Sequence, residues 1–186
     1  RSQRKRSHLP TISLVGYTNA GKSTLFEKLT GQDTLVSSRV FATLDTIVRR
    51  IWLGAGAEAL LSDTVGFIRK LPHQLVSAFR ATLEEVSASE LILHIIDASD
   101  IDHPAKMQAV DEVLMSLGCG THPQIRVYNK CDLIDQNFDL TPDGFAISAL
   151  SGEGIAGLKV RLLEEISKGK GSLNRKGAKT RRTMQN

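Results

Sequence analysis

The chain has few cysteines, few prolines and no long apolar run, and each shortage excludes a class of protein. Two cysteines, Cys119 and Cys131, supply neither a disulfide framework nor the ligand set of a structural zinc site. With 5 prolines and 15 glycines, the composition does not fit a fibrous or disordered chain. No apolar stretch approaches the roughly 18 residues that a membrane span needs, and the basic N-terminus does not resemble a signal peptide. We therefore expect a cytoplasmic protein.

Charge is distributed unevenly along the 186 residues. The formal net charge is +4, but both ends are basic without acidic residues, and residues 7–167 carry more acidic than basic side chains. We expect residues 1–10 to be a basic stub, residues 11–167 a single folded domain and residues 168–186 a basic, flexible tail. Such a tail could neutralise RNA phosphates or could be a solvated end. Because the chain does not begin with methionine, we expect the stub to end a missing N-terminal region.

Short apolar runs alternate with amphipathic stretches, which predicts an α/β fold with a mainly parallel six-stranded sheet and helices on both faces. The predicted strands are 11–15, 47–53, 59–63, 91–97, 125–129 and 145–148. The predicted helices are 22–29, 74–86, 105–117 and 155–166. In such sheets ligands bind beyond the carboxyl ends of the strands.

The most specific motif is a glycine-rich loop between the first predicted strand and the first predicted helix. Residues 16–23, GYTNAGKS, match G-x-x-x-x-G-K-[ST], in which backbone N–H groups and a helix N-terminus surround phosphates. Lys22 would reach the outer phosphates, and Ser23 would offer its hydroxyl to Mg²⁺. A glycine turn without a ligand is the alternative, and the strand–loop–helix context argues against it. The nucleotide-binding residues expected here are Gly16, Tyr17, Thr18, Asn19, Ala20, Gly21, Lys22, Ser23 and Thr24.

A second motif distinguishes among ATPases, kinases and GTPases. Residues 129–132, NKCD, follow an apolar strand, as N-K-x-D should. The Asp132 carboxylate can accept hydrogen bonds from the N1–H and 2-amino groups of guanine, a donor pair that adenine lacks. Asn129 would brace the base and the phosphate loop, and the aliphatic stem of Lys130 would cover the ring. Backbone N–H groups at the end of the last strand would meet the guanine oxygen: Ser148, Ala149 and Leu150.

Two segments are candidates for sensing the γ-phosphate. Residues 63–66, DTVG, end a predicted strand, so Asp63 would hold Mg²⁺ through water and the Gly66 N–H would bond the γ-phosphate. Thr43 is our candidate for the mobile hydroxyl that closes on Mg²⁺, and Thr46 is its competitor; Thr43 is favoured because a switch loop must precede the strand it leads into. The predicted Mg²⁺ ligands are Ser23, Thr43 and Asp63, and the predicted catalytic residues are Lys22, Thr43 and Gly66.

Three carboxylates follow the apolar strand that ends near residue 97: Asp97, Asp100 and Asp102. Their composition resembles an acidic metal site. Their position after a strand and before a predicted helix favours a loop that caps the helix.

The ordered segments GYTNAGKSTLF, FATLDT, DTVGFIRKLPHQLVSAF, LHIIDASD, NKCD and SALSGEG resemble the guanine-nucleotide-binding domain of the HflX family of GTPases. The resemblance covers residues 11 to about 166, and the segment DTVGFIRKLP is more specific to that family than the phosphate loop. It implies a P-loop NTPase fold of the Ras-like G-domain type, binding of GTP and GDP with Mg²⁺, and GTP hydrolysis. It also implies association with the large ribosomal subunit and its RNA, and separation or rescue of ribosomes under stress. Family members carry an N-terminal domain and a helical arm before this domain, where this chain has a basic stub.

Two residues bear on how hydrolysis would proceed. Phe67 occupies the position at which Ras-like enzymes carry a water-orienting glutamine, and a phenyl ring cannot orient water, so we expect slow intrinsic turnover. Asn19 resembles the residue of GTPases that seat K⁺ beside the phosphates, although it could instead only bond the loop backbone. A hydrolysing switch and a binding module in which GTP merely orders a surface both remain open. We expect a monomer.

Overall fold

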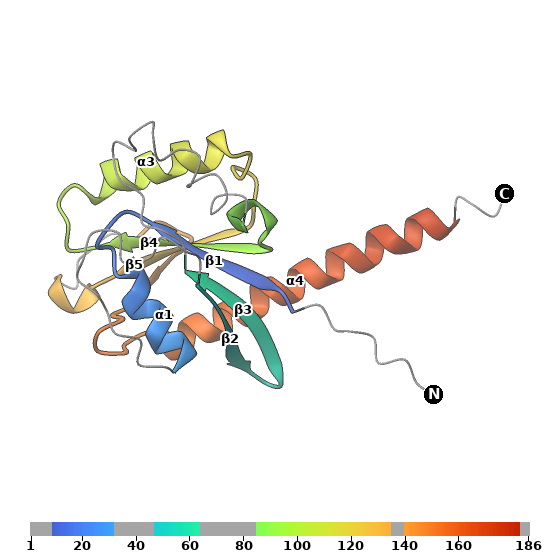
Figure 1. The fold of residues 1–186 in the computed structure, drawn as a ribbon, viewed down its shortest axis with the longest axis horizontal. Coiled ribbons are helices and arrows are strands. Elements are labelled where there is room, and N and C mark those ends of the chain that lie inside the picture. The colour runs from blue at the N-terminus through green and yellow to red at the C-terminus, as the bar shows by residue number, and fades with distance from the viewer. Residues whose placement is uncertain (1–8, 32–46, 64–84, 135–139, 183–186) are drawn as a thin grey trace.

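The computed structural model describes residues 9–31, 47–63, 85–134 and 140–182, with side chains described as far as Gly169 (Figure 1). Six strands form one sheet: β1 (Thr11–Gly16), β2 (Ile47–Gly54), β3 (Ala57–Asp63), β4 (Leu91–Asp97), β5 (Gln124–Asn129) and β6 (Gly144–Ala146). Their order across the sheet is β2-β3-β1-β4-β5-β6. Every neighbouring pair is parallel except β2 and β3, which form an antiparallel hairpin at one edge. The predicted mainly parallel six-stranded sheet is confirmed.

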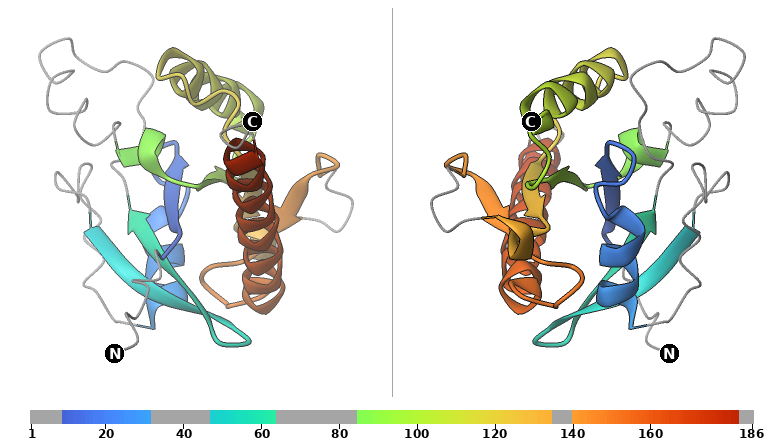
Figure 2. Two further views of the ribbon diagram at one scale, coloured as in Figure 1. Left: turned by 90° about the vertical axis from the view of Figure 1, so that its right-hand side faces the viewer. Right: turned by 90° about the vertical axis from the view of Figure 1, so that its left-hand side faces the viewer.

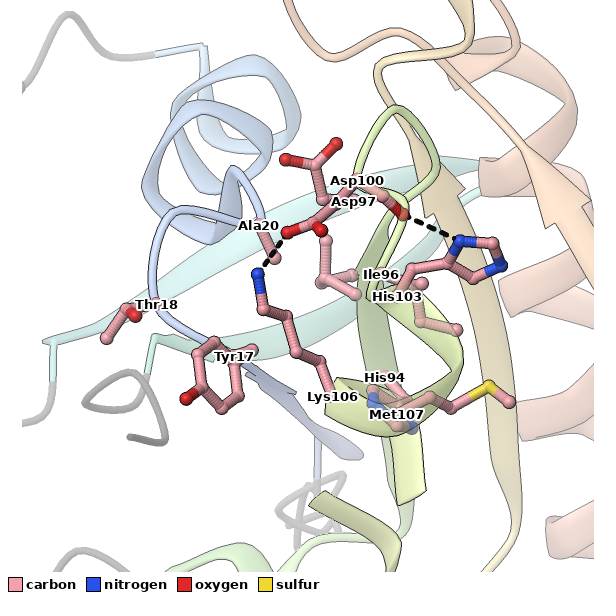
Figure 3. A pocket seen from close by; sticks show the side chains of 11 residues that line it. Tyr17, Thr18, Ala20, His94, Ile96, Asp97, Asp100, His103, Lys106 and Met107 are labelled. Carbon is pink, nitrogen blue, oxygen red and sulfur yellow. Dashed lines mark hydrogen bonds and ion pairs between the residues drawn. The ribbon is translucent and has the colours of Figure 1, made fainter. Parts of the chain in front are cut away.

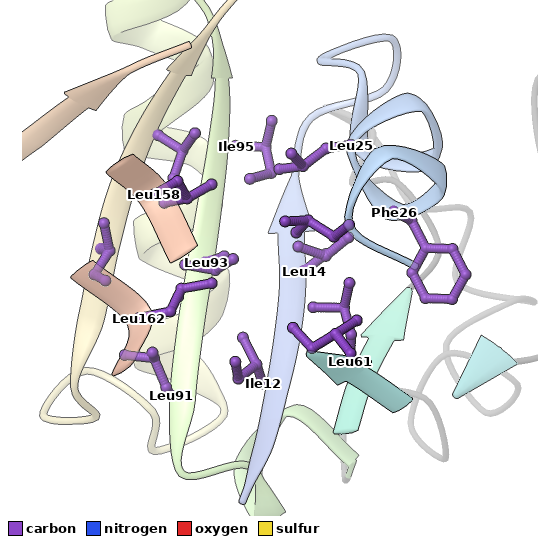
Figure 4. Close-up of a cluster of buried hydrophobic side chains, with 14 of the residues drawn as sticks. Ile12, Leu14, Leu25, Phe26, Leu61, Leu91, Leu93, Ile95, Leu158 and Leu162 are labelled. Carbon is purple, nitrogen blue, oxygen red and sulfur yellow. The ribbon is translucent and has the colours of Figure 1, made fainter. Parts of the chain in front are cut away.

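Two helices cover one face of the sheet. The helices α1 (Lys22–Thr30) and α4 (Ile155–Arg182) pack over a core in which alternate residues of the central strands point toward them (Figures 2 and 4). Leu91, Leu93 and Ile95 of β4 are all buried in this cluster. The period of two along a strand sends the residues between them to the opposite face.

A third helix, α3 (His103–Ser116), covers that opposite face. Val110 and Leu114 of α3 are buried against Val15 and Ile92 in a second apolar cluster. Because the central strands are covered on both faces, their sequences are nearly continuous runs of apolar residues. The predicted placement of helices on both faces is confirmed, while residues 74–84 of the predicted helix 74–86 lie outside the described residues.

Helix α4 is longer than the sequence pattern indicated. We expected it to end at Ile166, but its backbone stays helical to Arg182, and its second half extends beyond the sheet (Figure 1). The flexibility expected of residues 168–186 stays a prediction. No proline interrupts this segment, and lysine, arginine, leucine and alanine favour a helix, whereas each isolated glycine costs only about 1 kcal/mol. None of the helices in the described part of the chain is both long and apolar enough to cross a bilayer.

Candidate functional site

The predicted phosphate loop joins the end of β1 to the start of α1, and at two of its glycines there is no room for a side chain. Gly21 has φ of 90°, and a Cβ there would lie 2.2 Å from Nδ2 of Asn129. A Cβ on Gly16 would lie 2.3 Å from the carbonyl oxygen of Ile95. The loop backbone therefore passes closer to β4 and β5 than any side chain would allow.

Lys22, the first residue of α1, folds back over the loop. Its Nζ donates to the carbonyl oxygens of Gly16 at 3.1 Å and Tyr17 at 3.2 Å, and the residue is only 7% exposed. Burial lowers the pKa of Lys22 to about 8, a shift that the charge of Asp63 partly opposes. A buried cation at the mouth of a loop of backbone N–H groups is suited to bind phosphate oxygens.

Ser23 and Asp63 meet beside this lysine, although they lie 40 residues apart. The Ser23 hydroxyl donates to Oδ2 of Asp63 at 3.2 Å, and Asp63 is 3% exposed. Among the described residues, no hydrogen-bond donor reaches the buried Oδ1 of Asp63. Burial raises the pKa of Asp63, while Lys22 and the Ser23 hydroxyl oppose that rise. A hydroxyl beside a carboxylate with a free oxygen fits a Mg²⁺ site of the kind that retains several waters.

The expected γ-phosphate sensors Thr43 and Gly66 lie outside the described residues. The same is true of Thr46, the competitor of Thr43, and of Phe67. Their roles stay predictions.

Asn129, at the end of β5, connects the phosphate loop to the last strand. Its Nδ2 donates to the carbonyl oxygen of Ala20 at 2.9 Å, and its Oδ1 accepts from the backbone N–H of Ala149 at 2.9 Å. The side chain is 2% exposed, so both bonds are made away from water. The expected contact of Asn129 with the phosphate loop is present, and one side chain brings three sequence motifs together. Its expected contact with the base stays a prediction.

The residues expected to read the base lie next to Asn129. Asp132 is exposed within the short helix η2 (Cys131–Leu133), and Lys130 has a left-handed backbone with φ of 65°. The Ala149 N–H is taken by Asn129, and the Ser148 N–H donates to the carbonyl oxygen of Glu153 at 3.0 Å. Two of the three N–H groups assigned to the guanine oxygen thus already have partners within the protein, and that contact stays a prediction.

Comparison with known proteins decides what this arrangement is. Residues 11–130, more than half of the chain, match the protein family described as 50S ribosome-binding GTPase. The chain belongs to this family. GTPase HflX of Caldanaerobacter subterraneus is 47% identical over 172 residues, covering 90% of this chain and 38% of the relative. GTPase HflX of Escherichia coli is 43% identical over 174 residues, covering 90% of this chain and 41% of the relative. These relatives confirm the predicted HflX-type GTP-binding domain, which spans about two-fifths of their length.

Solved structures confirm the P-loop GTPase fold. A GTP-binding protein of Sulfolobus solfataricus in complex with GDP superposes with a TM-score of 0.67 at 27% identity, covering 86% of this chain and 53% of that one. Era of Aquifex aeolicus, bound to GDP and AlF₄⁻, gives a TM-score of 0.68 at 24% identity, covering 84% of this chain and 56% of that one. The likeness to Era concerns the fold alone.

In this GTPase domain a pocket opens between the phosphate loop and the N-terminal turn of α3 (Figure 3). Lys106 of α3 reaches over it, with its Nζ 5.4 Å from the centroid of the Tyr17 ring and paired with the carboxylate of Asp100. Sequence reasoning did not find this contact, because nothing in a local pattern aligns the first turn of α3 with the loop. In the described part of the chain, no group of three histidine, cysteine or acidic residues is placed to hold a metal ion. The cap differs from the expected one, since Asp102 at the N-cap makes no side-chain cap bond and its N–H donates to Oδ1 of Asp100.

Proposed function

We propose that this chain is a GTP-hydrolysing switch domain that acts on the large ribosomal subunit. The observation that carries the proposal is the pair of hydrogen bonds made by the Asn129 side chain, one to Ala20 of the phosphate loop and one to Ala149 after the last strand. It unites a phosphate-binding loop with a loop that carries the base-reading carboxylate of Asp132. The relatives are named GTPases, which supports the same reaction here.

The phosphates, the bound Mg²⁺ and the base of GTP would each have a separate partner in the site. Lys22 would exchange its hydrogen bonds to the loop carbonyls for bonds to the outer phosphate oxygens. Asp132 would accept hydrogen bonds from the N1–H and 2-amino groups of guanine. Ser23 and Asp63 would hold Mg²⁺, which supplies positive charge to the β- and γ-phosphate oxygens when bound. Thr43 and the Gly66 N–H complete the proposal as the groups that respond to the γ-phosphate.

The ribosomal partner is inferred from the family and from charge. The matched family is described as binding the 50S ribosome, and both ends of this chain are basic. Residues 168–182 are rich in lysine and arginine and contain no acidic residue, a composition suited to contact with RNA phosphates. We place this activity in the cytoplasm and expect the domain to act as a monomer.

Phosphate release from GTP under multiple turnover tests the proposal. We expect turnover on the order of 10⁻³ s⁻¹ or slower without ribosomes, because Phe67 cannot orient the attacking water. Purified large subunits should accelerate it, small subunits should not, and ATP should yield no phosphate above background. Phe67→Ala should change the basal rate less than about tenfold, the scale of one positioning contact. Rapid turnover without ribosomes, or equal turnover of ATP, would contradict the proposed function.

We further propose K⁺ as an activating ion near Asn19. This residue is exposed at the rim of the phosphate loop with φ of 63°, and its side chain makes no hydrogen bond to another described residue, so its amide oxygen is available to a cation. GTP hydrolysis should be at least about tenfold faster in KCl than in NaCl at equal ionic strength, the scale of an added positive charge at the phosphates. The advantage should vanish in Asn19→Ala while GTP binding persists. Equal rates in both salts would leave Asn19 a purely structural loop residue.

A further inference from the structure

An ion pair links the ends of β4 and β5 beside the predicted base-binding site. Oδ2 of Asp97, the last residue of β4, lies 2.5 Å from Nζ of Lys130, and the side chains are 17% and 33% exposed. Asp97 pairs with Asn129 in the parallel register of the two strands. The Lys130 side chain is therefore drawn back from its own loop toward the neighbouring strand.

The carboxylate that receives Lys130 is itself fixed. Oδ1 of Asp97 accepts both the backbone N–H of Ser99 at 3.1 Å and the Ser99 hydroxyl at 2.6 Å, which leaves Oδ2 for the lysine. The Ala98 N–H donates to the carbonyl oxygen of Asn129 at 2.9 Å, so the two strand ends are also tied through their backbones. Lys130 thus meets an acceptor whose orientation is set before any ligand binds.

This pair lies where the base-reading loop and the phosphate loop approach each other. Asp97 lines the same pocket as Thr18 and Ala20 of the phosphate loop, while Lys130 is two residues from Asp132 (Figure 3). The lysine stem accordingly runs from the base-reading loop to the carboxyl end of β4, which lines the same pocket as the phosphate loop.

We propose that Asp97 is a positioning residue for the guanine nucleotide, holding Lys130 extended so that its aliphatic stem covers one face of the base. The proposal rests on the guanine site proposed above. Without Asp97, the lysine would sample several rotamers, and ordering it on binding would cost side-chain entropy. The consequence is faster loss of bound nucleotide, with no change in which base is chosen, because Asp132 makes that choice.

Release of a fluorescent GDP analogue after mixing with excess GDP provides the test. Asp97→Ala should accelerate release about two- to fivefold, the scale of a partly exposed ion pair, and Asp97→Asn less, because its amide oxygen still accepts from Lys130. In a Lys130→Ala background, Asp97→Ala should add no further acceleration. Asp102→Ala is the matched control, since this exposed aspartate of the same loop makes no side-chain cap bond, and it should release GDP as the parent does.

A structural role for Asp97 makes different predictions. If Asp97 were only structural, Asp97→Ala would accelerate GDP release by the same factor with and without Lys130. That result, or an unchanged release rate in Asp97→Ala, would overturn the proposal. If Asp97→Ala does not fold, Asp97→Asn in both backgrounds gives the same comparison. The base preference of Asp132→Asn is measured separately. If this variant keeps the wild-type preference for guanine, the guanine site itself is contradicted. If its preference switches while the Asp97 variants release GDP at the parent rate, only the positioning role is contradicted.

Discussion

Asp132→Asn is expected to exchange guanine for xanthine as the preferred base. The aspartate offers two acceptors to the N1–H and 2-amino groups of guanine, whereas asparagine offers one acceptor and one donor. The donor faces the 2-amino group unfavourably in GTP but matches the 2-carbonyl oxygen of xanthosine triphosphate. We expect GTP affinity to fall at least about a hundredfold, in line with the strong rejection of ligands that leave buried polar groups unpaired.

Competition between GTP and xanthosine triphosphate, measured by displacement of a fluorescent nucleotide, checks this exchange. Asp143→Asn is the matched control, because Asp143 is an exposed aspartate in the turn before β6. It should leave both affinities as in the parent chain. An Asp132→Asn variant that still prefers GTP would remove the base-reading assignment.

Lys22→Ala is expected to abolish most Mg²⁺-dependent GTP binding while the domain stays folded. The lysine is the cation buried within the loop, and each charge-assisted hydrogen bond it makes to phosphate contributes about 1.5–3 kcal/mol. Losing one such bond weakens binding about ten- to a hundredfold. Stability without nucleotide should change little, because the cost of burying the charge, visible in the lowered pKa of Lys22, offsets its two bonds to loop carbonyls.

Calorimetric titration with GTP and a thermal melt of the ligand-free protein separate these effects. Lys28→Ala, a change of an exposed lysine on the same helix, should leave both quantities unchanged. A Lys22→Ala variant that binds GTP normally would rule out the phosphate loop as the binding site.

Much of the fold could be predicted because its signals are local. The alternation of short apolar runs with helical stretches placed every strand to within a few residues, and β4 lies at its predicted bounds. The hairpin of β2 and β3 was not predicted as antiparallel, since strand direction depends on a short turn at Ala55 and Gly56. The end of α4 was placed too early, because glycines among basic residues resemble a tail and yet do not end a helix.

In the site, too, the features with local sequence signals could be predicted and those that depend on packing could not. The phosphate loop and the bracing role of Asn129 followed from motifs whose spacing is tied to their chemistry. The pairs Asp97–Lys130 and Lys106–Tyr17 join residues on different elements, so only the packing of β4, β5 and α3 reveals them. The order of the strands is the one signal that could have indicated the Asp97–Lys130 pair. Because β4 and β5 are parallel neighbours, the residues at their carboxyl ends lie close together.

Calorimetric titration of the chain with GTP, GDP and ATP in the presence of Mg²⁺ tests the central claim most directly. If Asn129 joins a phosphate loop to a guanine-reading loop, GTP and GDP should bind with one site per chain, and ATP should bind at least about a thousandfold more weakly. Comparable binding of ATP, or binding of neither guanine nucleotide by the folded protein, would contradict it.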